Sequence, residues 1–157
     1  MTSIPADYLA RFAPFMQAPP IDVAACAEAA GLTIYSLDLP NGVSGMITRA
    51  DDGVSFECYV DSSEPSVRQR FTAAHELGHF VLHRDMIGDG IQDNYLLRAE
   101  GLTNTQEAQA NRFAADLLMP RNLISQAIDG GTTSVGALAE LFRVSEIAMS
   151  IRLGLKT

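Results

Sequence analysis

Apolar residues recur at two different periods along this chain, and the change of period separates extended from helical segments. Short segments bounded by turn residues predict strands at 32–37, 43–49 and 54–60. The turn Asp51-Asp52-Gly53 joins the last two strands as a hairpin. Helical spacing, with capping residues at the ends, predicts the helices 7–12, 22–30, 66–82, 107–119, 120–128, 135–142 and 146–153. Strands gathered among helices predict an α+β fold with a small sheet.

The strand predicted at 54–60 shows how the sheet is covered. Apolar residues occupy every second position, at Phe56, Cys58 and Val60. This alternation is typical of a sheet with one buried face. We expect that face to pack on the helix at 66–82.

That helix carries the segment His75-Glu76-Leu77-Gly78-His79, an H-E-x-x-H pattern. Residues four apart lie on one face of a helix, about 6 Å apart along its axis, so two imidazoles can reach one metal ion. The glutamate beside them can take a proton from a water in an open coordination position. A zinc hydrolase has this arrangement. Ser63 or Ser66 can cap the helix.

The alternative interpretation is an amphipathic helix whose histidines are buried and hydrogen-bonded. The distribution of histidine counts against it, because the three histidines of the chain all fall at positions 75, 79 and 83. We therefore favour a metal site.

A catalytic zinc usually has three protein ligands, so a third residue is needed. His83 lies eight residues after His75, about 12 Å along a helix, and cannot share an ion with both other histidines. Asp85 stands where metzincins carry their third ligand, but Leu82 replaces the glycine of that pattern. A carboxylate from a later element remains, and Glu107 is the best candidate. Its alternative role is a favourable interaction with the dipole of its own helix.

The helix that carries Glu107 has well-marked ends and a face suited to close packing. A capping box at Thr103 or Asn104 begins it, and Pro120 ends it. Asn111 lies one turn after Glu107 and could hydrogen-bond near it. Small residues that would let another helix approach closely are Ala110, Ala114 and Ala115.

Two blocks of the sequence resemble the ImmA/IrrE family of metallo-endopeptidases. The first is Arg70-Phe71-Thr72-Ala73-Ala74-His75-Glu76-Leu77-Gly78-His79 with His83 after it, and the second covers 107–120. The family carries R-F-T-x-A-H-E-L-G-H and then E-x-x-A-N-x-F-A-x-x-L-L-M-P, and both blocks match nearly residue for residue. The resemblance implies a zincin-like fold, with the sheet packed on the H-E-x-x-H helix.

The resemblance also implies roles for the site residues. His75, His79 and Glu107 would bind one zinc ion, and Glu76 would be the catalytic base. Residues that could support the ligands or stabilise an oxyanion are His83, Asn111, Arg68, Arg70 and Tyr95. In zinc peptidases of this general build, an exposed edge strand aligns the substrate. The sequence leaves open which strand is the edge.

The link at 84–102 joins the two helices of the expected site. Its length and its glycines are typical of a functional or disordered loop, and it could form a flexible flap over the site. The spacing of its aspartates does not match an EF-hand, so calcium is not predicted.

Length and composition suggest one globular unit of 157 residues. We expect a metallopeptidase domain at 1–130 and a helical, helix-turn-helix-like segment at 131–157 that packs on it. No apolar run is long enough to span a membrane, and the first residues do not read as a signal peptide. Cys26 and Cys58 are isolated from each other, which favours a reduced, cytoplasmic protein.

The segment at 138–148 is similar to a helix-turn-helix core. The net charge of −8 argues against direct nucleic-acid binding. The second helix of this motif, which would be the recognition helix, offers side chains poorly suited to DNA, namely Glu146, Met149, Ser150 and Arg152. We expect these helices to pack on the domain.

Three functions follow as hypotheses. The resemblance favours a zinc endopeptidase of narrow specificity that cleaves an XRE-type helix-turn-helix repressor in a stress or mobile-element response. The second is a toxin-like or regulatory module that holds zinc and binds an antitoxin with little proteolysis. The third is a DNA-binding regulator that uses the segment at 134–153.

Overall fold

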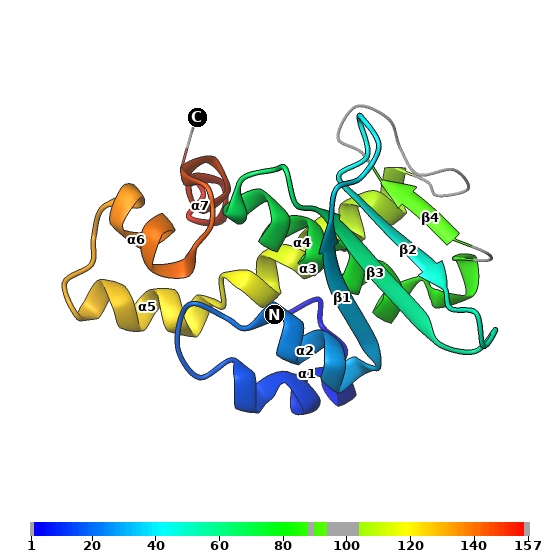
Figure 1. Cartoon of the computed structure of the whole chain (residues 1–157). Coiled ribbons are helices and arrows are strands. Elements are labelled where there is room, and N and C mark those ends of the chain that lie inside the picture. The colour runs from blue at the N-terminus through cyan, green and yellow to red at the C-terminus, as the bar shows by residue number, and fades with distance from the viewer. Residues whose placement is uncertain (1, 88–89, 94–103, 156–157) are drawn as a thin grey trace.

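The structure is a computed structural model and describes residues 2–87, 90–93 and 104–155 (Figure 1). The helices are α1 (Ala6–Phe12), α2 (Val23–Ala30), α3 (Ser66–Leu82), α4 (Asn104–Leu118), α5 (Arg121–Asp129), α6 (Val135–Phe142) and α7 (Glu146–Arg152). The strands are β1 (Leu32–Leu37), β2 (Gly45–Arg49), β3 (Phe56–Asp61) and β4 (Gly90–Asp93). Two short 3-10 helices lie at Ala13–Phe15 and Arg84–Met86. The α+β fold predicted from the sequence is confirmed.

The strands of the described residues form one mixed sheet in the order β1-β3-β2-β4. β1 runs parallel to β3, whereas β2 runs antiparallel to both β3 and β4. The prediction of a loop at 84–102 was wrong for β4. This strand is short and begins with glycine, so it has no alternating pattern of its own, and pairing with β2 holds it. The rest of the expected flap, at 88–89 and 94–102, lies outside the described residues.

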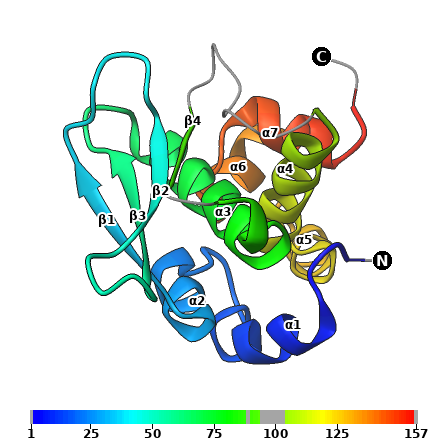
Figure 2. The ribbon, with the colours of Figure 1, turned by 90° about the vertical axis from the view of Figure 1, so that its right-hand side faces the viewer.

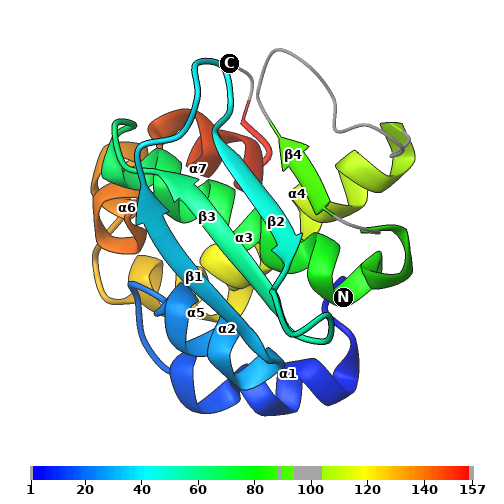
Figure 3. The same cartoon turned by 45° about the vertical axis from the view of Figure 1, so that its right-hand side comes forward.

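The helices gather on one face of the sheet (Figures 2 and 3). On that face Cys58 and Val60 of β3 are buried, as the alternation predicts. Phe56 is buried there too, and its ring meets Phe80 of α3 edge to face, with 5.5 Å between the centroids. The core therefore lies between the sheet and α3.

α3 is the central helix of the fold, because every residue at 72–80 is buried. Its other side packs against α4, where Ala110 and Ala114 are fully buried. At the closest point a Cβ added to Gly78 would lie 3.1 Å from Cβ of Phe113. Small residues on both helices thus allow the close approach expected from the sequence.

Capping contacts mark both ends of α2, whereas α3 begins differently from its prediction. The Asp22 carboxylate accepts from the N–H of Ala25, and Gly31 ends the same helix with a positive φ of 95°. At α3 the prediction of a Ser63 or Ser66 cap was wrong. Pro65 holds the N-cap position without a side-chain bond, and the Ser63 hydroxyl donates to Asp61 instead.

Among the described helices, none has the length and apolar character that a bilayer crossing requires.

Asp116, near the end of α4, ties both ends of the described chain to the core. Its carboxylate accepts from the Ser3 N–H at 2.7 Å and lies 2.8 Å from the Arg152 guanidinium of α7. Arg152 also donates to the Met119 carbonyl. Burial raises the pKa of Asp116, but the bonds from Ser3 and the charge of Arg152 outweigh it and lower this pKa below its ordinary value.

Gly78→Ala should destabilise the protein by about 1–2 kcal/mol, because overpacking against Phe113 exceeds the gain of about 1 kcal/mol in helix propensity. Gly136→Ala in α6 is the matched control. A Cβ there would meet only the movable end of the Glu146 side chain. The control should be as stable as the parent or slightly more so in urea unfolding. Equal stability of the two variants would contradict the tight contact between α3 and α4.

Asp116→Asn should lower the free energy of unfolding by about 3 kcal/mol near neutral pH, because it leaves the Arg152 charge buried without its counter-ion. The folded-state pKa of Asp116 is lowered, so its contribution is present above the unfolded pKa and lost as the pH falls through the folded pKa. The gap between parent and variant should therefore shrink below about pH 4. Urea titrations at several pH values test this, and a gap that persists in acid would argue against the ion pair.

Candidate metal centre

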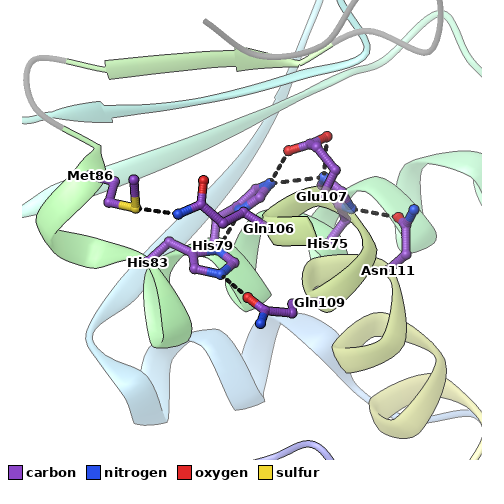
Figure 4. A network of polar contacts seen from close by, with 8 residues as sticks. All are labelled: His75, His79, His83, Met86, Gln106, Glu107, Gln109 and Asn111. Atoms are coloured by element: carbon purple, nitrogen blue, oxygen red, sulfur yellow. Dashed lines mark hydrogen bonds and ion pairs between the residues drawn. The ribbon is translucent and has the colours of Figure 1, made fainter. Parts of the chain in front are cut away.

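Three side chains from two helices converge at one point (Figure 4). His75 and His79 come from α3 and Glu107 comes from α4. Each offers one ligand atom, and these atoms lie within 4.8 Å of one another. The structure thus brings together the three residues that the sequence and the family resemblance suggest as metal ligands.

The local sequence explains this convergence. The two histidines are four residues apart, so their rings stand on the same side of α3 one turn apart. Their centroids lie 4.6 Å from each other. Glu107 lies in the first turn of α4, and the contact between Gly78 and Phe113 brings that helix close enough for its carboxylate to reach the rings.

The distances identify which atoms face the centre. His79 Nε2 lies 2.8 Å from Glu107 Oε1, and His75 Nε2 lies 3.6 Å from Glu107 Oε2. The two Nε2 atoms are 3.1 Å apart. Two imidazole nitrogens and one carboxylate oxygen form a donor set of the kind found in catalytic zinc sites. The residues present therefore fit a metal ion.

Electrostatics favour the ionised carboxylate that a metal requires. Burial raises the pKa of Glu107, but hydrogen bonds and charge attraction from His75 and His79 outweigh this effect and hold the pKa well below its usual value. Glu107 therefore offers a negative charge at neutral pH.

Glu76 follows His75 on α3 and is fully buried. Its side chain lies beneath the start of β2, where a Cβ on Gly45 would come within 3.5 Å of Glu76 Cγ. The same Cβ would stand 2.5 Å from Cγ2 of Thr72. Glycine at position 45 thus lets β2 approach α3 and leaves room for the carboxylate.

Polar side chains reach the far nitrogens of both ligand histidines. Asn111 Oδ1 lies 2.8 Å from His75 Nδ1, and His83 Nδ1 lies 2.9 Å from His79 Nδ1. The Nε2 atom of His83 in turn lies 2.8 Å from Gln109 Oε1. Sequence reasoning missed Gln109, because a glutamine in an exposed helical position has no distinguishing pattern.

Two other candidates, Arg70 and Arg68, have contacts elsewhere among the described residues. Arg70 donates to the main-chain carbonyls of Arg143 and Phe142 at the end of α6, which occupies its guanidinium away from the cluster. Arg68 lies 3.6 Å from Glu64. Tyr95 lies outside the described residues.

Comparison with known proteins agrees with this geometry. The family model described as the IrrE N-terminal-like domain, Peptidase_M78, matches residues 27–154. The radiation response metalloprotease IrrE of Deinococcus radiodurans is 37% identical over 93 residues, which cover 58% of this chain and 27% of the relative. The protein of the same name from Deinococcus deserti is 35% identical over 91 residues, which cover 57% of this chain and 31% of the relative. The chain thus spans about a third or less of these relatives.

A solved structure shares the fold. The Mycobacterium tuberculosis transcriptional regulator superposes with a TM-score of 0.61 at 17% identity, over 97% of this chain and 48% of that one. At this identity the likeness concerns the fold alone. The family model covers most of the chain, and the two relatives are named as metalloproteases. The chain therefore belongs to the IrrE N-terminal-like, M78 family of metallopeptidases.

Proposed function

We propose that this protein is a zinc-dependent endopeptidase that acts on very few protein substrates. The observation that carries the proposal is the convergence of His75, His79 and Glu107, with Glu76 buried on the same helix. Two imidazoles and one carboxylate leave a coordination position open for water or substrate. A purely structural zinc site would instead be closed by a fourth protein ligand.

A zinc ion held by these three residues would polarise a peptide carbonyl and make water more acidic. Glu76 is the proton carrier in this scheme. Its carboxylate takes a proton from the water as the oxygen attacks the carbonyl carbon. It then gives that proton to the amine as the peptide C–N bond breaks.

An extended substrate would bind along β4. Among the described strands, β1 and β4 are the two edges of the sheet, and β4 lies beside the first turns of α4, from which Glu107 projects (Figures 1 and 3). β1 is at the opposite edge of the sheet. In the described part of the chain, β4 pairs only with β2, so the main-chain groups on its other side could pair with an added strand and hold the peptide next to the metal ligands.

The proposed substrate is a helix-turn-helix repressor of the XRE type, in the cytoplasm. This part of the proposal rests on the resemblance of the two sequence blocks to the ImmA/IrrE family. The structure offers little support for DNA binding by the protein itself. Arg152, a cation on the would-be recognition helix, is nearly buried and paired with Asp116, so it is not available to a phosphate.

His79→Ala and Glu107→Gln should each reduce zinc affinity by at least tenfold, because the first removes a ligand and the second replaces the carboxylate ligand with a weaker, neutral amide. The measurement is zinc content and competition with a chromophoric chelator, on proteins whose circular dichroism matches the parent. Arg68→Gln on the exposed start of α3 serves as the control and should bind zinc normally. Unchanged affinity in Glu107→Gln would remove this residue from the site.

The Glu76→Gln variant should still bind zinc, but its cleavage rate should fall more than a hundredfold, because an amide cannot carry the proton. The test incubates zinc-loaded protein with a candidate XRE-type helix-turn-helix repressor, and intact-mass measurement detects fragments. Cleavage by the parent but not by the variant supports the proposal. Cleavage by both would refute the role of Glu76. Tight binding of the repressor by the parent without any fragments would favour the toxin-like, partner-binding function.

A further inference from the structure

The proposed zinc site requires that each of its two histidines carry its proton on a particular ring nitrogen. A neutral imidazole that binds a metal through Nε2 carries its remaining proton on Nδ1. If that Nδ1–H is buried, it needs an acceptor, because an unpaired buried donor is costly. His79 has no exposed surface and His75 has very little, so the partners of their Nδ1 atoms matter.

For His75 the partner is simple. Asn111 Oδ1 lies 2.8 Å from His75 Nδ1. An amide oxygen only accepts hydrogen bonds, so His75 donates from Nδ1 and leaves its Nε2 lone pair facing the centre.

For His79 the partner is another imidazole. His83 Nδ1 lies 2.9 Å from His79 Nδ1. One proton is shared between two nitrogens, so one ring must donate and the other must accept. If His83 donated, the proton of His79 would sit on Nε2 and block the metal. Glu107 Oε1, 2.8 Å from that nitrogen, would accept the misplaced proton.

Gln109 decides the direction of this bond. Its Oε1 lies 2.8 Å from His83 Nε2, and as an amide oxygen it accepts. His83 therefore carries its proton on Nε2 and presents a lone pair at Nδ1. That lone pair accepts the Nδ1–H of His79, and His79 Nε2 then carries a lone pair that can bind the metal.

We propose that His83 is a positioning residue that holds His79 in its metal-binding tautomer, and that Gln109 sets the tautomer of His83. The inference rests on the proposed zinc site. Backbone geometry supports it, because α3 ends at Leu82 and His83 has left helical geometry, with φ −129° and ψ 27°. The turn places its ring against that of His79, with 5.1 Å between the centroids. Figure 4 shows the resulting series of hydrogen bonds from Gln109 through His83 to His79.

The most direct test is nuclear magnetic resonance on the zinc-loaded parent protein with labelled histidine. A hydrogen bond between two nitrogens transmits a scalar coupling between them. We expect such a coupling between His79 Nδ1 and His83 Nδ1, with the proton attached to His79 and a second proton attached to Nε2 of His83. A proton attached to His83 Nδ1 would overturn the proposal, as would the absence of the coupling.

Two substitutions at position 83 provide the matched comparison. In His83→Asn, the amide oxygen is as many bonds from Cβ as Nδ1 is, so the acceptor is kept. His83→Phe keeps a ring and removes the acceptor. We expect zinc affinity to fall about 10- to 100-fold in the Phe variant and much less in the Asn variant. Equal affinities in these two variants would contradict the proposal, whatever their overall level.

Gln109→Met adds a variant that should fold normally, because Gln109 is exposed. Water can replace its oxygen there, so we expect only a few-fold loss of zinc affinity and faster exchange of the His83 Nε2 proton with solvent. An unchanged exchange rate would contradict the role of Gln109. If the parent protein failed to bind zinc, the proposed function would fail as well. Normal zinc binding without the expected coupling would reject only the proposed roles of His83 and Gln109.

Discussion

The contact between Gly78 and Phe113 sets the distance between the two helices on which the whole site depends. α3 supplies two ligands and the buried glutamate, but it cannot supply the third ligand, because a helix advances too far per turn. α4 has to come close, and a Cβ at position 78 would stand 3.1 Å from Phe113. Ala110 and Ala114 on the facing helix are fully buried for the same reason. The proposed chemistry therefore depends on a packing requirement, and the small residues of both helices meet it.

The close approach of the helices also organises the proton positions in the site. α4 delivers a carboxylate to the Nε2 atoms of both histidines and an amide oxygen to the Nδ1 atom of one of them. The other Nδ1 atom is reached through His83 and Gln109. One helix thus provides a ligand and also the groups that orient the ligands of its neighbour. Supporting contacts of this kind are as much a part of a metal site as the ligands themselves.

Sequence reasoning recovered what is local. The helices and the strands β1, β2 and β3 follow from patterns within a few positions. The H-E-x-x-H spacing and the family resemblance suggested the cluster that the structure assembles. Sequence reasoning missed features that depend on contacts between distant parts of the chain. β4 exists because it pairs with β2, and Gln109 matters because His83 turns toward it at the end of α3. Neither the pairing of β4 nor the contact between Gln109 and His83 leaves a local pattern in the sequence.

The central claim is that His75, His79 and Glu107 hold one zinc ion and leave Glu76 off the metal. Crystals grown with zinc and measured at the zinc absorption edge would test this most directly. We expect one anomalous peak per chain, from a zinc ion bonded to the two Nε2 atoms and to the Glu107 carboxylate at about 2.0–2.2 Å. We also expect that the Glu76 carboxylate is not coordinated to the zinc. A zinc bound by Glu76 or His83, or no peak between α3 and α4, would contradict the claim.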